Sequence, residues 1–157
     1  MKFIYLGIFL NRKGFGYACI ETPEKLLEYG IVSVRPWDAY RIYKRVSKYL
    51  AMFQPTALVL RDVNAIESKR IQKLTHDLVE LAVEQNVSVH QYSREEVQKV
   101  FEIVGATSKM ERAKAIVENG YEELKDRLPK RSWPYEDYNM GIFDALALIR
   151  THQCNMP

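Results

Sequence analysis

Two apolar runs at the start of the chain, joined by a short polar turn, constrain the fold more than any other feature. Residues 2–10 are typical of a buried strand, and the turn at residues 11–14 returns the chain into a second strand over residues 15–21. A third apolar run, residues 30–34, ends before Pro36, whose missing amide hydrogen suits the exit from a strand. This spacing predicts an antiparallel meander of three strands.

After the meander, amphipathic helices alternate with short apolar strands. Asp38 can cap a helix that Pro55 stops, and residues 57–60 form a fully apolar run of the kind found in central parallel strands. A second helix then leads to a further strand over residues 87–92. The predicted apolar stripes of the two helices are Tyr43, Val46, Leu50 and Phe53, then Ile71, Leu74, Leu78 and Leu81. This order of elements predicts an α/β sheet flanked by helices.

Three more helices are expected towards the end of the chain. Ser93 and Ser108 each precede a glutamate by three residues, which is the capping-box pattern of a helix N-terminus. The last helix should begin near Pro134, because proline is tolerated in the first turn of a helix. Its inward-facing residues are predicted to be Ile142, Ala145, Leu146 and Ile149.

Composition favours one globular domain spanning residues 1–157, since 47% hydrophobic content is enough to bury a core. The net charge of +3 is compatible with a polyanionic partner but does not require one. Cys19 and Cys154 give neither a disulfide framework nor a metal-ligand spacing, which favours a reduced, cytoplasmic protein. The three histidines are too scattered to predict zinc, and no run predicts a signal peptide or a membrane span.

The opening hairpin, residues 6–20, resembles that of RuvC-type Holliday-junction resolvases. Four later segments are similar to this family in the same order, and the resemblance covers residues 4–152. These segments are residues 54–60, residues 87–93, residues 105–117, and Asp144-Ala145-Leu146-Ala147 through His152. The resemblance implies a ribonuclease H-like fold, with a five-stranded mixed sheet in which an antiparallel meander is joined by parallel strands. It also implies a homodimer, DNA as partner and a role in DNA recombination.

The resemblance further implies where a metal site would lie. Such nucleases hold two magnesium ions with four acidic or histidine ligands. Carried over by position, the ligands fall on Phe9, Arg61, Gly141 and Asp144. A phenyl ring offers no lone pair to a hard cation, and a guanidinium repels one, so three of the four positions are degenerate and only Asp144 remains a ligand. We therefore expect no cofactor and a pseudoenzyme that binds DNA or another nucleic acid, branched forms included.

Two alternatives stay open. One is a divergent structure-selective endonuclease that uses magnesium or manganese held by Asp144, Asp137 and Asp62. Asp137 lies seven residues before Asp144, on the same helix face if the helix extends that far, and Asp62 reaches the site only if its strand ends or bulges at Arg61. The other is a structural or assembly module on the same fold.

Basic residues are the candidate nucleic-acid contacts. Lys109, Arg112 and Lys114 form a group beside Arg94 and Lys99, and they either bind phosphates or cover a solvated helix face. Arg61 is a further candidate. Its guanidinium is either solvated at the end of its strand or buried in a pair with Asp144. It is also able to pair with a phosphate.

Overall fold

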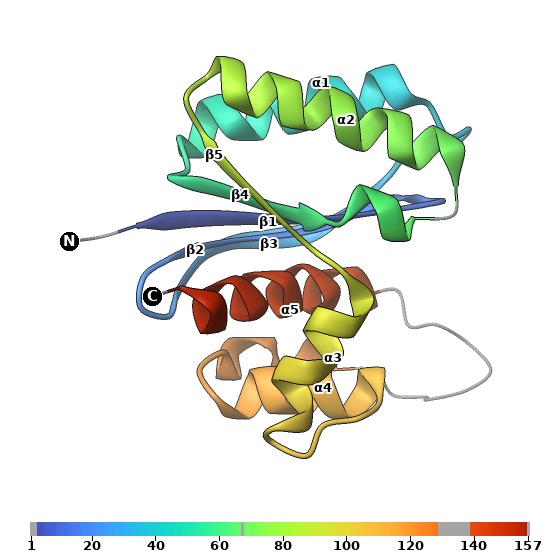
Figure 1. Ribbon diagram of the computed structural model, residues 1–157. Coiled ribbons are helices and arrows are strands. Elements are labelled where there is room, and N and C mark those ends of the chain that lie inside the picture. The colour runs from blue at the N-terminus through green and yellow to red at the C-terminus, as the bar shows by residue number, and fades with distance from the viewer. Residues whose placement is uncertain (1–2, 67, 129–138, 157) are drawn as a thin grey trace.

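A five-stranded mixed sheet forms the centre of the molecule, with strand order β3-β2-β1-β4-β5 (Figure 1). The computed structural model describes residues 3–66, 68–128 and 139–156. The strands are β1 (Ile4–Asn11), β2 (Gly14–Glu21), β3 (Lys25–Ser33), β4 (Ala57–Arg61) and β5 (Ser88–Tyr92). β1 to β3 pair as an antiparallel meander, while β4 is parallel to both β1 and β5. The predicted α/β architecture is confirmed.

Helices cover both faces of the sheet (Figure 1). Two lie on one face, α1 (Ala39–Phe53) and α2 (Lys69–Glu84). Three lie on the other face, α3 (Arg94–Glu102), α4 (Lys109–Glu118) and α5 (Met140–Asn155). Two short 3₁₀ helices follow β4 and α4, namely η1 (Val63–Ala65) and η2 (Glu122–Arg127). No helix in the described ranges is long and apolar enough to span a bilayer.

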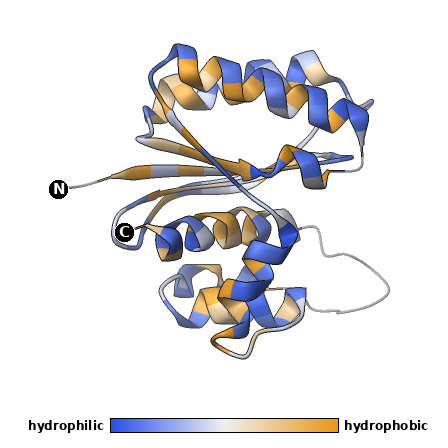
Figure 2. Ribbon diagram, viewed as in Figure 1, coloured by the Kyte–Doolittle hydropathy of each residue, from blue (hydrophilic) through white to orange (hydrophobic). Residues whose placement is uncertain are grey.

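The pleat of the strands decides which side chains reach the functional face. Successive strand residues point to opposite faces, so Leu6, Ile8 and Leu10 of β1 pack under α1 and α2. Tyr5 and the partly buried Phe9 pack instead on the side of α5. Figure 2 shows α5 hydrophobic over much of its length, because it lies between the sheet and the α3–α4 pair.

Side-chain caps fix the helix starts where the sequence predicts them. Asp38 accepts a hydrogen bond from the backbone N–H of Arg41 and so begins α1. Ser93 and Ser108 both form complete capping boxes, with the glutamate side chain returning to the backbone of the serine. The predicted stripes of α2 and α5 are confirmed, since all eight residues are buried.

Two details differ from the sequence-based prediction. β3 begins at Lys25 rather than Gly30, because the edge strand pairs with β2 through its backbone and tolerates charged side chains. In α1, Ile42 and Tyr49 are buried beside Val46 and Leu50, whereas Tyr43 and Phe53 are only partly buried. The predicted helix start near Pro134 lies outside the described residues, and the described part of α5 begins at Met140.

Candidate nucleic-acid interface

Glycines bring α5 unusually close to β2 beside Phe9. Gly16 lies directly opposite Phe9 in the β1–β2 pair. A Cβ atom built on Gly16 would lie 2.2 Å from the backbone carbon of Gly141, and a Cβ on Gly141 would lie 3.1 Å from the Cα of Gly16 and 2.9 Å from Cδ1 of Ile31. Real Cβ atoms essentially never approach backbone as closely as 2.2 Å, so position 16 needs glycine. A Cβ at position 141 would be tight against the backbone of Gly16, which gives a packing reason for glycine there.

Phe9 and Arg61 contact each other directly. The guanidinium carbon of Arg61 lies 4.6 Å from the centroid of the Phe9 ring, and its Nη1 donates to the carbonyl oxygen of Leu10 at 3.4 Å. Burial lowers the pKa of Arg61, the negative charge of Asp144 raises it, and the positive charge of Arg94 lowers it. Arg61 is therefore half-buried, with its guanidinium on an aromatic face and in the electrostatic field of Asp144. This arrangement lies between the two predicted alternatives, a solvated Arg61 and an Arg61 buried against Asp144.

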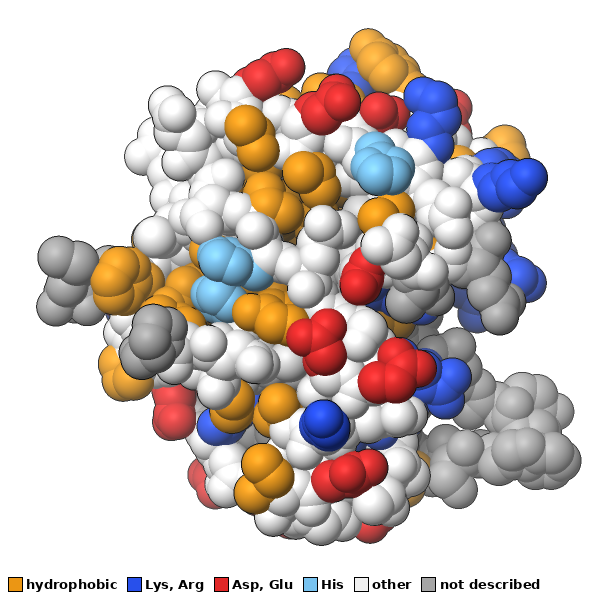
Figure 3. All heavy atoms as spheres, in the orientation of Figure 1, with side chains coloured by type: hydrophobic (Ala, Val, Ile, Leu, Met, Phe, Trp, Pro, Cys, Tyr) orange, Lys and Arg blue, Asp and Glu red, His pale blue; other side chains and the backbone are white. Residues whose placement is uncertain are grey.

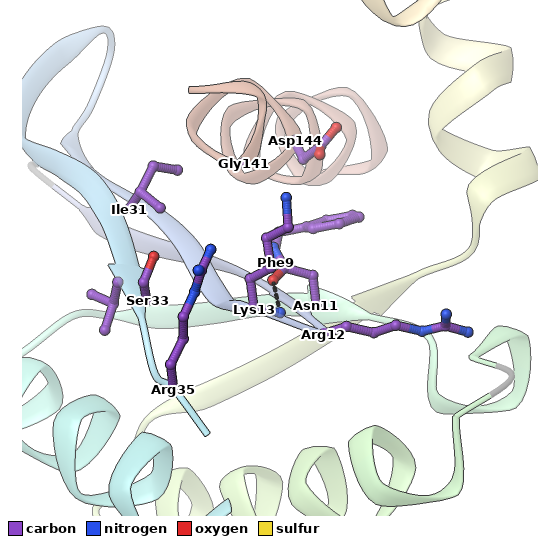
Figure 4. A pocket seen from close by; sticks show the side chains of 10 residues that line it. Phe9, Asn11, Arg12, Lys13, Ile31, Ser33, Arg35, Gly141 and Asp144 are labelled. Carbon is purple, nitrogen blue, oxygen red and sulfur yellow. Dashed lines mark hydrogen bonds between the residues drawn. The ribbon is translucent and has the colours of Figure 1, made fainter. Parts of the chain in front are cut away.

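Two adjoining hollows, each of about 300 Å³, share Phe9 and Asp144 in their linings. The first lies between the β1–β2 turn, the end of β3 and the start of α5 (Figure 4). The second lies between the end of β4, α3, α4 and α5. We call the two hollows together the basic groove, because their lining includes Arg12, Lys13, Arg35, Arg61, Arg94, Lys109 and Arg112.

Positive side chains far outnumber negative ones in the described lining of the groove. Its lining holds seven of the 23 lysines and arginines, but Asp144 is its sole carboxylate among the described residues, although the chain contains 20 aspartates and glutamates. The rest of the chain is consequently acidic on balance. Such separation focuses positive potential at one site and favours an anionic ligand there.

Asp144 is a counter-charge for the surrounding cations. Its side chain is 13% exposed, and its Oδ2 lies 4.0 Å from Nζ of Lys109. Burial lowers the pKa of Arg112, and the charge of Asp144 opposes that shift. The described residues contain no group of three His, Cys, Asp or Glu side chains close enough to hold a metal ion. The donor set of the described residues, with Asp144 as its one carboxylate in the groove, therefore does not fit the pair of divalent ions that the resemblance implies.

The structure places four of the six predicted basic residues together in the basic groove. Arg61, Arg94, Lys109 and Arg112 line one hollow, whereas the exposed side chains of Lys99 on α3 and Lys114 on α4 do not line the groove. The carboxylate of Asp62 accepts a hydrogen bond from the backbone N–H of Asn64 at 2.9 Å and caps η1. β4 does end at Arg61, yet Asp62 lines neither hollow. Asp137 lies outside the described residues.

Sequence reasoning missed Arg12, Lys13 and Arg35 as members of the groove. The sequence did contain a signal for them. It predicts β1 and β4 in one sheet, and the carboxyl ends of parallel strands lie at the same edge of a sheet. The turn after β1 must then lie beside Arg61. Figure 4 shows Arg12 and Lys13 leaving that turn, with Arg35 entering from the end of β3 and Asp144 from α5.

Comparisons with known proteins identify the fold. No protein-family model matches the sequence, and no curated protein matches it. Among solved structures, Thermus thermophilus RuvC in complex with a Holliday-junction substrate matches with a TM-score of 0.69 and 20% identity, over 96% of this chain and 92% of that one. A second Thermus thermophilus RuvC structure matches with a TM-score of 0.67 and 23% identity, over 96% and 93% of the two chains. The chain therefore has the ribonuclease H-like fold of RuvC, as its opening hairpin predicts.

Proposed function

We propose that this protein binds nucleic acid through the basic groove and does not cleave it by metal-dependent chemistry. The observation that carries the proposal is the gathering of seven cations with Asp144 as the one carboxylate of the described groove lining. Lysine and arginine contacts to phosphates supply most of the affinity of sequence-independent nucleic-acid binding. A protein of the same fold, Thermus thermophilus RuvC, was solved with a Holliday-junction substrate, which makes branched DNA the first ligand to test.

The chemistry of the site supports binding without cleavage. Phe9 supplies a ring instead of an oxygen ligand, and Arg61 places a permanent positive charge on that ring. A divalent cation here would meet electrostatic repulsion rather than a cluster of carboxylates. The endonuclease alternative needs Asp62 as a partner of Asp144, but Asp62 is engaged in capping η1. These contacts favour the pseudoenzyme over the nuclease.

Fluorescence anisotropy with a four-way junction, a duplex and a single strand tests binding. The double variant Arg94→Ala/Lys109→Ala removes two groove cations, and we expect the affinity to fall about tenfold for each cation removed. The matched control is Arg41→Ala/Lys48→Ala, which removes one arginine and one lysine from the exposed side of α1 across the sheet. Equal losses in both variants would contradict a role for the groove. Failure of the wild-type protein to bind at low salt would favour the assembly module instead.

The homodimer and the cytoplasmic location stay predictions. Light scattering coupled to gel filtration separates a monomer of 18.4 kDa from a dimer of twice that mass. A dimer would carry two basic grooves, which suits a nucleic acid with several strands, such as a junction.

A further inference from the structure

A third hollow adjoins the basic groove and is lined by aromatic and uncharged side chains instead of cations. It measures about 320 Å³, and its described lining includes Phe3, Tyr5, His90, Tyr92 and His152 but no lysine, arginine, aspartate or glutamate. We call it the histidine pocket. Figure 3 shows two histidines side by side on this face of the molecule, surrounded by hydrophobic side chains. The described lining of the pocket therefore carries no permanently charged side chain, and five of its ten residues carry rings.

Direct contacts hold the rings of the pocket in place. The imidazole rings of His90 and His152 are 4.1 Å apart between centroids, with an interplanar angle of 32°. The ring of Tyr5 meets that of His152 edge-on at 5.3 Å. The hydroxyl of Tyr92 lies 2.7 Å from Nδ1 of His152, and the hydroxyl of Ser88 lies 2.8 Å from Nε2 of His90. These contacts hold the rings in place before any ligand arrives. Tyr5 and His152 are themselves buried, so the partly exposed rings of Phe3, His90 and Tyr92 are the surfaces that a ligand would meet.

The pocket and the groove adjoin at Tyr92. Tyr92 at the end of β5 lines both the histidine pocket and the second hollow of the groove. On α5, Asp144 and Leu148 line the groove and His152 lines the pocket. Residues four apart lie on one helix face, so His152 follows Leu148 by about 6 Å along the axis. A chain of phosphates in the groove would thus have aromatic rings within reach.

We propose that the histidine pocket takes an unpaired nucleobase of a strand whose phosphates lie in the basic groove, an inference that rests on the proposed function. A nucleotide needs cations for its phosphate and flat apolar surfaces for its base. The two neighbouring sites provide these separately, and the absence of formal charge from the described lining of the pocket suits a neutral base. Base stacking on aromatic side chains is sequence-tolerant, so the pocket selects unpaired over paired strands rather than one sequence.

The test uses a single-stranded oligonucleotide that carries one 2-aminopurine, and the same strand with an abasic site at that position. We expect the wild-type protein to quench the 2-aminopurine fluorescence and to bind the abasic strand at least about fivefold more weakly, as loss of one stacked base predicts. His90→Ala should abolish this preference, and His90→Phe should restore it, because a phenyl ring still stacks. His76→Ala is the matched control, since His76 is exposed on α2 across the sheet.

The outcomes separate the two proposals. Equal affinity for the intact and abasic strands, with binding that still weakens when groove cations are replaced, would overturn the histidine pocket and leave the groove in place. No binding of either strand at low salt would overturn the proposed function itself. A base preference that survives in His90→Ala but is lost in His76→Ala would place the base elsewhere and would also overturn the inference. Thermal unfolding of each variant confirms that its fold is intact.

Discussion

Placing an acidic residue at position 141 is expected to destabilise the fold instead of building a metal site. A Cβ atom on Gly141 would lie 2.9 Å from Cδ1 of Ile31, 3.1 Å from the Cα of Gly16 and 3.4 Å from the backbone nitrogen of Gly16. The end of the Ile31 side chain can move aside. The backbone of Gly16 is held between β1 and β3, so it has little freedom to move.

The expected cost follows from these contacts. Overpacking of this kind costs about 1–3 kcal/mol. Aspartate is a better helix former than glycine by a few tenths of a kcal/mol, and a negative charge in the first turn of a helix contributes about 0.3–1 kcal/mol. Taking the middle of each range, the net loss for Gly141→Asp is about 1 kcal/mol, which lowers Tm by roughly 2–4 °C in a protein of this size.

Urea unfolding followed by circular dichroism measures this loss. Gly141→Ala introduces the same Cβ without charge and serves as the control for the steric part. In Gly141→Asp/Ile31→Ala the crowding side chain is shortened, so the two changes should couple by at least about 0.5 kcal/mol. If Gly141→Asp is as stable as the wild type, position 141 has room for an acidic side chain and the packing explanation for its glycine is wrong.

Three further predictions concern the groove and its surroundings. A double-mutant cycle with Phe9→Ala and Arg61→Met should give a coupling of about 0.5–1 kcal/mol in urea unfolding, as a half-exposed cation–π contact does, and no coupling would contradict that contact. Burial and the charge of the neighbouring histidine lower the pKa of His152 below its usual value. The unfolded chain therefore binds this proton more readily, so the free energy of unfolding should fall as pH drops through about 6.5, and His152→Asn should remove that part of the slope. On single strands, the slope of log affinity against log salt should become shallower by about 0.7 in Arg94→Ala and stay unchanged in Lys99→Ala, whereas equal slopes in the two variants would remove Arg94 from the interface.

Local patterns were sufficient to predict most of the fold. The turn at residues 11–14 and the alternation around it predict the hairpin, and the capping boxes at Ser93 and Ser108 predict two helix starts correctly. The first half of β3 was missed because an edge strand gains its stability from backbone pairing with β2, which leaves little apolar signal in residues 25–29. Pairing across strands is a tertiary property, and hydrophobic periodicity in one segment cannot report it.

The site was less predictable than the fold. Position-by-position comparison with the RuvC family drew attention to Phe9 and Arg61, but their stacking on one another required the register of β1 and β4. Arg35 is separated from Arg112 by about half of the chain, and only the folded sheet brings their elements to one groove. From the sequence, Gly141 is interpreted as a missing metal ligand. In the structure it lies close to the backbone of Gly16, which gives a packing reason for glycine at this position.

Binding and cleavage of one labelled four-way junction, measured with and without divalent metal, tests most directly whether the groove binds phosphates without using a metal. At constant ionic strength we predict the same affinity in EDTA, magnesium and manganese, with no product on a denaturing gel from either the wild-type protein or Asp144→Ala. The contradicting result is a product that forms only with metal and disappears in Asp144→Ala, because it would show that Asp144 is a ligand in an active nuclease.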